Sequence, residues 1–254
     1  MKRKRANSSN SGQALIITSL IITMLLLSTA YHIIEMKRAT TRNETTTNYI
    51  FSAARLNTIN TMVSALANVS NGGERDVLTA NLGKLALALR DHYYDTQCDL
   101  LFVPLDSSLY QDGIRMSWES GGSGISSACV SFLMNLSEFS TSYNSGYEAN
   151  VTTTLTINGV YTGSGGQKGV NVTCSIYNEE EPALANGITL FYQDETEGQW
   201  IMVSSSNDLN VIDCGNGTYL MSFNVYAQNV LNVSAHVQDL RDIFVMANTT
   251  CTFI

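Results

Sequence analysis

The apolar run from Ala14 to Ile34 constrains this chain more than any other feature. It contains twenty-one residues and no charge. A helix rises about 1.5 Å per residue, so a helical run of this length matches a hydrocarbon core of about 30 Å. Such a segment is expected to span a membrane, to be removed as an export signal, or to pack against other helices.

The charges around this run predict an orientation. Lys2, Arg3, Lys4 and Arg5 precede it, and the rest of the chain holds 10 basic and 22 acidic residues, a net charge of −12. Basic flanks stay on the cytoplasmic side. We therefore expect a cell-membrane protein whose N-terminus is cytoplasmic and whose bulk is extracellular. Because an acidic surface repels phosphate backbones, we expect no nucleic acid partner.

The junction before the run carries a resemblance. A basic leader, residues 1–12, ends in Gly12, and "QAL" follows before the apolar helix of residues 13–36. This resembles the class III (type IV prepilin) signal of archaeal and bacterial pilins, and especially the "GQAL" start of tight-adherence minor pilins. The resemblance implies cleavage between Gly12 and Gln13, and a helix that packs with copies of itself or other pilin-like subunits. Many pilins carry Glu at the fifth mature position, where this chain has Ile17.

Two other interpretations of the run stay open. Ser28 and Ala30 are small residues at the positions that a signal peptidase reads, so cleavage before Tyr31 would release a secreted protein. An uncut helix would instead be a permanent anchor.

Two helices are expected after the run. Residues 44–67 show an apolar stripe at steps of three and four residues: Tyr49, Ala53, Leu56, Ile59, Val63 and Leu66. A second stripe consists of Leu78, Leu82, Leu85 and Leu89. From Cys98 the period changes to two, which predicts strands, and Asn158-Gly159 predicts a tight hairpin turn. Residues 37–162 thus form a predicted membrane-proximal helical plus β module.

The remaining residues predict a second module. The Gly-rich stretch 163–169 is typical of a short linker. About seven short strands with alternating apolar residues follow in 170–254, a pattern typical of an immunoglobulin-like β-sandwich. The predicted fold class is therefore α+β: an N-terminal membrane or pilin-like long helix, a small α+β module and a C-terminal Ig-like sandwich.

Asparagine and cysteine positions suggest modification. Eight N-glycosylation sequons follow the run: Asn43, Asn68, Asn135, Asn150, Asn171, Asn216, Asn232 and Asn248. The five cysteines form no C-x-x-C pair, which argues against a zinc site. In an oxidising compartment we expect a Cys98–Cys129 disulfide and a bridge from Cys174 to Cys251 or Cys214.

Catalytic chemistry is not indicated. The three histidines, His32, His92 and His236, have no neighbouring nucleophile or metal ligand in sequence, and the acidic stretches 178–182 and 194–198 match no EF-hand. We expect no catalytic, cofactor-binding or metal site.

The sequence favours a non-enzymatic, glycosylated surface protein, pilin- or pseudopilin-like, used for packing or adhesion. The leader and sequons favour an archaeal source. The alternative is a permanently membrane-anchored ectodomain that binds a ligand or a partner membrane protein.

Overall fold

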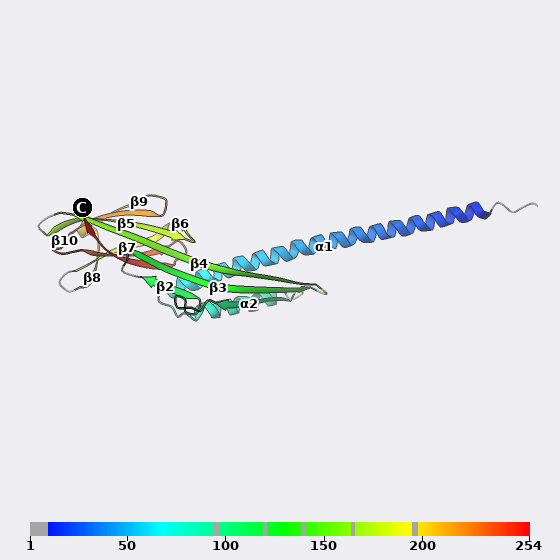
Figure 1. Ribbon diagram of the computed structural model, residues 1–254, viewed down its shortest axis with the longest axis horizontal. Coiled ribbons are helices and arrows are strands. Elements are labelled where there is room, and N and C mark those ends of the chain that lie inside the picture. Colours follow the sequence, from blue (N-terminus) through cyan, green and yellow to red (C-terminus); the bar gives the residue numbers. More distant parts are fainter. Residues whose placement is uncertain (1–9, 94–96, 119–120, 139–140, 164–165, 195–197) are drawn as a thin grey trace, which may run out of the picture. The chain divides into compact units, whose positions relative to one another are not determined.

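The computed structural model describes residues 10–93, 97–118, 121–138, 141–163, 166–194 and 198–254 (Figure 1). The chain divides into two compact units, residues 1–52 and residues 53–254. The first unit holds the N-terminal part of helix α1, which runs Asn10–Ser70. The second unit holds the rest of α1, helix α2 (Val77–His92) and all of the strands.

The second unit contains thirteen strands among the described residues, in two sheets. The larger sheet has the order β1-β3-β4-β5-β10-β9, with β13 beside β4, β2 beside β3 and β6 beside β5; the smaller has the order β12-β11-β7-β8. The bounds are β1 Cys98–Pro104, β2 Ile114–Trp118, β3 Ser123–Glu138, β4 Thr141–Thr162, β5 Gln167–Asn178, β6 Glu181–Pro182, β7 Ala185–Gln193, β8 Trp200–Met202, β9 Asn210–Asp213, β10 Thr218–Tyr226, β11 Asn232–Asp239, β12 Phe244–Thr250 and β13 Thr252–Phe253. A short 3-10 helix, η2 (Ser205–Asn207), lies between β8 and β9.

The core of the second unit lies between the two sheets. Side chains from β4, β5 and β10 meet side chains from β7, β11 and β12 in one buried cluster. The strand sequences explain this, because apolar residues alternate with polar ones and so fall on one face. In β5 the fully buried residues are Val170, Val172, Cys174 and Ile176, while Asn171 and Thr173 are exposed.

The predicted fold class is wrong. Among the residues that the structure describes, strands account for 50% and helices for 29%, so the fold is mostly β rather than α+β. Among the residues that the structure describes, no helix is both long enough and apolar enough to cross a membrane. The predicted division into a first module and an Ig-like sandwich starting at residue 170 also differs from the structure, because β3 and β4 belong to the same sheet as β5 and β10.

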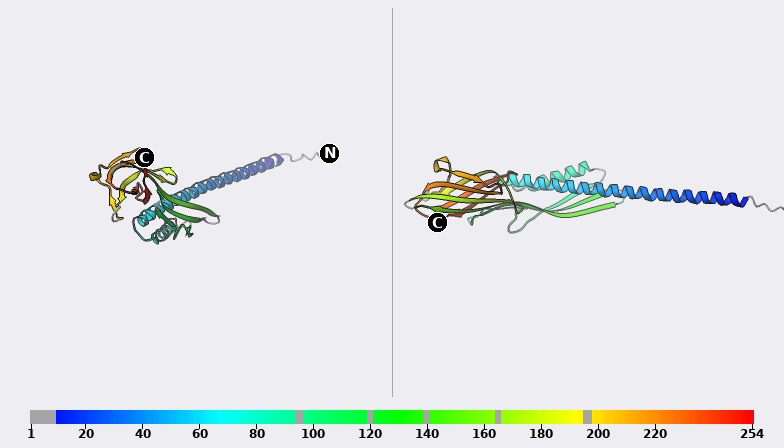
Figure 2. Two further views of the ribbon diagram at one scale, coloured as in Figure 1. Left: turned by 60° about the vertical axis from the view of Figure 1, so that its left-hand side comes forward. Right: turned by 90° about the horizontal axis from the view of Figure 1, so that it is seen from above.

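The long strands β3 and β4 explain this difference. They pair antiparallel from Ser123↔Thr156 to Glu138↔Thr141 and lie side by side (Figure 1, Figure 2). Strand β4 then pairs with β5 from Thr153↔Asn178 to Thr162↔Gly169. The predicted linker 163–169 therefore falls between two paired strands, and its last three residues belong to β5.

The predicted hairpin turn at Asn158-Gly159 is also wrong. Strand β4 continues through both residues, which pair with Thr173 and Val172. A Cβ added at Gly159 would collide with Cys251 Sγ. The glycine is needed for this close approach of a core side chain and not for a turn.

The C-terminal part of α1 packs on the sheets through a different stripe from the predicted one. Leu66 is buried as expected, but Leu56 and Tyr49 are exposed, and the buried positions include Ala54, Thr58, Met62 and Val69. The Thr58 hydroxyl donates to the Arg55 carbonyl and contacts the Tyr147 hydroxyl at 2.9 Å. This pairing allows a polar side chain to be buried in the stripe. On α2 the predicted residues Leu78, Leu82 and Leu89 are buried.

An ion pair between a fully buried carboxylate and a half-buried guanidinium fixes the turn between β11 and β12. Asp239 is fully buried and accepts hydrogen bonds from the Arg241 and Ile243 backbone N–H groups and from Thr153 Oγ1. Arg241 Nε lies 3.0 Å from Asp239 Oδ2, and its Nη1 lies 2.9 Å from Glu179 Oε1. The guanidinium therefore joins the smaller sheet to β4 and to the turn after β5.

Replacing Arg241 by Met is expected to lower the free energy of unfolding by about 3 kcal/mol, because it leaves the Asp239 carboxylate buried without its cation. Urea denaturation at neutral pH checks this. Arg90→Met, at an exposed position of α2, is the matched control and should change stability by less than about 0.5 kcal/mol. Equal stability of the two variants would contradict the assigned role.

Candidate functional site

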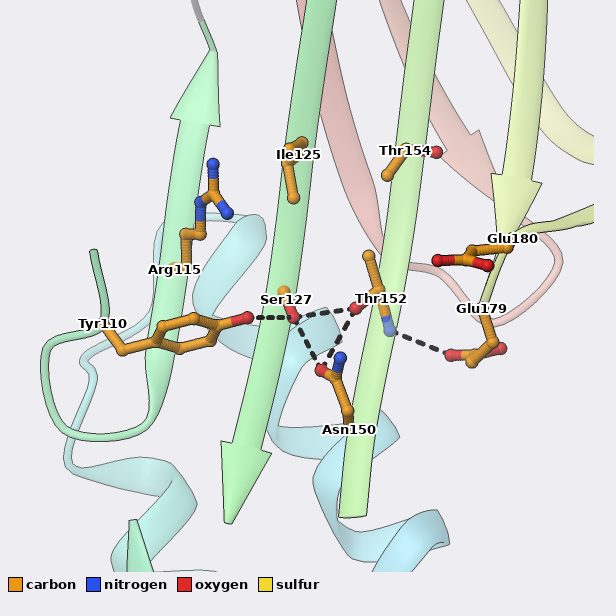
Figure 3. A pocket seen from close by; sticks show the side chains of 9 residues that line it. All are labelled: Tyr110, Arg115, Ile125, Ser127, Asn150, Thr152, Thr154, Glu179 and Glu180. Carbon is orange, nitrogen blue, oxygen red and sulfur yellow. Dashed lines mark hydrogen bonds between the residues drawn. The ribbon is translucent and has the colours of Figure 1, made fainter. Parts of the chain in front are cut away.

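A polar groove lies on the outward face of the larger sheet. It has a volume of about 470 Å³, and it is lined by Tyr110, Arg115, Ile125, Ser127, Asn150, Thr152, Thr154, Glu179 and Glu180 (Figure 3). The strands β2, β3 and β4 supply six of these side chains, and the turn between β5 and β6 supplies the two glutamates. The volume falls within the range of small-molecule sites.

The sheet register creates a row of functional groups across the groove. Arg115 pairs with Ser127 in the β2–β3 ladder, and Ser127 pairs with Thr152 in the β3–β4 ladder. The Thr152 backbone N–H donates to Glu179 Oε1 at 2.8 Å, which extends the row to the β5–β6 turn. Figure 3 shows the guanidinium and the carboxylates on opposite sides of the groove. With neighbouring strands about 4.8 Å apart, the row spans about 14 Å.

A hydrogen-bond network forms the floor of the groove. Ser127 Oγ donates to Asn150 Oδ1 at 2.9 Å, and Thr152 Oγ1 donates to the same oxygen at 3.1 Å. Ser127 Oγ also lies 3.1 Å from the Tyr110 hydroxyl and 2.8 Å from Thr152 Oγ1. Because Asn150 Oδ1 faces these hydroxyls, its amide Nδ2 is the group left to interact with a bound molecule.

The charges at the two ends of the row differ in their pairing. Glu179 is bound by Arg241 through both carboxylate oxygens, at 2.9 and 3.1 Å. Arg115, in contrast, makes no hydrogen bond or ion pair within the described part of the chain, and its Nε is buried without an acceptor. Glu180 is exposed and has a left-handed backbone, with φ of 71°. Counting only partners in the described ranges, the groove thus offers one unpaired cation, Arg115, and one unpaired carboxylate, Glu180.

The sequence did not predict this site. Of its residues, Asn150 was expected only as a glycosylation acceptor, and Glu179 and Glu180 only as part of the acidic stretch 178–182, where no metal site was expected. Arg115 and Thr152 are ordinary outward-facing residues of predicted strands. One signal in the sequence could have drawn attention to Arg115: it is a cation at an outward strand position in a chain with few basic residues. Only the register of β2 on β3, however, places it beside Ser127.

The predicted glycosylation acceptors differ in accessibility. Asn68, Asn150, Asn171 and Asn216 are exposed, whereas Asn135, Asn232 and Asn248 are half-buried. Asn232 Nδ2 donates to Gln193 Oε1 at 2.9 Å, so attachment of a glycan there would break a hydrogen bond. The side chain of Asn43 is not among the described ones, and the burial of the predicted processing site, Gly12 and Gln13, is likewise outside the description.

The expected disulfides are not formed. All five cysteines are free thiols. Cys98 pairs with Leu136 in the β1–β3 ladder, whereas Cys129 lies beyond the opposite end of that ladder, next to Val130. This separation far exceeds the distance of about 7 Å between Cα atoms that a disulfide allows. Cys174 and Cys251 share the core cluster, and Cys214 is exposed.

Burial makes four of the thiols poor nucleophiles. It raises the pKa of Cys98 and of Cys251 to about 11 and that of Cys174 to about 12. Burial also raises the pKa of Cys129 to about 11, together with a hydrogen bond from its Sγ to Glu148 Oε1 at 3.3 Å. Thiolates are the reactive form, so these positions are protected by both chemistry and access.

Iodoacetamide at pH 8 is therefore expected to modify one thiol in the folded protein, that of Cys214, and all five after unfolding. Intact-mass measurement counts the added groups. The variant Cys214→Ser should take up none while folded. Rapid labelling of a second thiol in folded protein, or fewer than five labels after unfolding without reductant, would contradict this assignment.

The remaining predicted features bring no catalytic group together. His92 is exposed beside Tyr93, and His236 lies between the rings of Phe191 and Phe244, where burial lowers its pKa. Among the described residues no three His, Cys, Asp or Glu side chains are arranged to hold a metal ion, and residues 195–197 of the second acidic stretch lie outside the described ranges. The groove itself is suited to binding a polar molecule.

No protein-family model and no curated protein matches this chain.

Proposed function

We propose that this chain is a non-enzymatic structural protein of the cell surface, a pilin-like subunit that assembles with copies of itself through residues 19–37 of α1. One observation carries the proposal: these residues are exposed wherever their side chains are described, although most are large and apolar. The exposed apolar residues are Leu20, Ile22, Met24, Leu25, Leu26, Leu27, Tyr31, Ile33, Ile34 and Met36.

The apolar side chains of this segment project from all sides of the helix. Met24 to Leu27 are four consecutive exposed residues, and successive helical residues are rotated by about 100°, so these four point to all sides. A helix that is apolar on every side is stable when other apolar groups surround it. A bundle of several such helices provides this environment, whereas one docking partner would cover only one side.

The hydroxyl residues of the segment are compatible with close helix packing. Thr23 Oγ1 donates to the Ser19 carbonyl at 2.8 Å, and Thr29 Oγ1 donates to the Leu26 carbonyl at 2.9 Å. Each hydroxyl is therefore satisfied within its own helix and presents a methyl group outward. Small side chains at these positions let neighbouring helices approach closely, which favours copies of the helix as the surrounding material.

A second candidate function is a ligand-binding protein held permanently at the membrane, with its N-terminus cytoplasmic and its bulk outside. The groove with its unpaired Arg115 favours this candidate. The two candidates differ in what surrounds the segment 19–37, namely copies of the chain or lipid.

Replacing Leu26 by Asp is expected to abolish self-association, because a carboxylate in the centre of a helix bundle would be desolvated. Analytical ultracentrifugation and electron microscopy of the full chain check this: the wild type forms large assemblies and Leu26→Asp is monomeric. Leu240→Asp is the matched control, since Leu240 is equally exposed (64% against 65%) but lies in the β11–β12 turn. A wild-type chain that is monomeric in buffer and also monomeric in lipid vesicles would reject assembly and support the anchored candidate.

Prepilin-type processing is a separate expectation. Removal of residues 1–12 leaves a mature protein that begins at Gln13, and terminal-peptide mass spectrometry of protein from its native host detects this. Gly12→Val should block the cleavage. A native protein that keeps its leader would contradict the pilin resemblance, and a start at Tyr31 would indicate secretion.

A further inference from the structure

We infer that the groove on β2, β3 and β4 binds a sugar acid, with Arg115 holding the carboxylate and the groove floor holding the hydroxyl groups. This inference rests on the groove residues and on the ion pair of Glu179 with Arg241, and it does not depend on the assembly proposed above.

The unpaired guanidinium defines the first requirement of the ligand. Arg115 Nε is buried and has no acceptor, and a buried donor without a partner is costly. The guanidinium presents several N–H donors in a plane, which suits the two oxygens of a carboxylate. Its terminal Nη1 and Nη2 groups are not buried and make no hydrogen bond among the described residues, so a carboxylate at this end of the groove can accept from them.

The floor defines the second requirement. Asn150 Nδ2 is a donor directed away from the network, while Ser127, Thr152 and Tyr110 hold their hydroxyl oxygens at fixed positions. A molecule with several hydroxyl groups can both donate to and accept from such a surface. A simple anion such as sulfate has only acceptors and would leave the hydroxyl oxygens unused.

The far end of the row defines the third requirement. Glu179 is occupied by Arg241, and the carboxylate of Glu180 lines the same wall with no ion pair inside the described ranges (Figure 3). A carboxylate accepts hydrogen bonds and repels a second anionic group, so the ligand is expected to present hydroxyl groups here. A sugar acid has the required order of groups: one carboxylate, then neutral hydroxyls.

The ligand can be a free sugar acid or a sugar chain with one sugar acid at its end and neutral rings behind it, because both present the same groups. The row spans about 14 Å, which accommodates more than one sugar ring. Ile125 and the Tyr110 ring give the ligand an apolar surface beside its polar contacts.

The test is calorimetric and NMR titration of the full chain, without N-glycans, at low salt. The probes are D-galacturonate, a disaccharide in which galacturonate is linked to neutral galactose, and D-galactose. We expect both acids to bind and galactose to bind at least about tenfold more weakly, because it lacks the carboxylate. Tighter binding of the disaccharide would identify the acidic end of a longer sugar chain as the ligand, and equal binding a free sugar acid.

The variants test the assigned contacts. Arg115→Met is expected to weaken galacturonate binding by roughly 10-fold to 100-fold, and Arg115→Lys by less, because it keeps the charge but loses the planar pair of donors. Arg90→Met, on exposed α2, should bind like the wild type. Equal affinity for galacturonate and galactose, unchanged binding in both Arg115 variants, or no binding of either acid at tens of millimolar would overturn the inference.

Discussion

The pairing of β4 with its two neighbours is the interaction on which the rest of the structure depends. Sixteen residue pairs join β4 to β3, and ten join it to β5. Each ladder satisfies backbone groups that would otherwise be unpaired in the interior. The ladders also join chain segments before and after residue 163 into one sheet. The inward face of β4 then contributes to the core, and its outward face carries Asn150, Thr152 and Thr154 into the groove.

Local patterns predicted the strands well but not their assembly. The alternating segments 99–103, 114–118, 170–176 and 219–225 lie within β1, β2, β5 and β10, because alternation of apolar and polar residues depends only on neighbouring positions. Register and strand order depend on residues far apart in sequence. The Asn158-Gly159 signal failed for this reason, since the glycine is required by Cys251, almost a hundred residues later. The predicted disulfides failed similarly, because spacing in the sequence does not give the register of β1 on β3.

The candidate site was even less accessible to prediction. Its row of groups combines single residues from β2, β3, β4 and the β5–β6 turn, and none of these residues belongs to a recognisable motif. The ion pair of the buried Asp239 with Arg241 could likewise not be predicted, although the two residues are only two positions apart. An acidic and a basic residue in a turn usually lie in solvent. Burial of such groups is a property of the folded sheets and not of the local sequence.

The close approach of Cys251 to Gly159 constrains the stage of folding at which the Cys251 thiol can be exposed to an oxidant. The sulfur fills the space that the missing Cβ leaves, so an oxygen atom or a second thiol attached to it would have no room in the core. A chain oxidised at this cysteine before its sheets close could not reach the native packing. In the closed structure the same sulfur is shielded from reagents. The order of events is therefore fixed: folding has to precede oxidation, so a chain delivered to an oxidising space must either fold quickly or be kept reduced until it does.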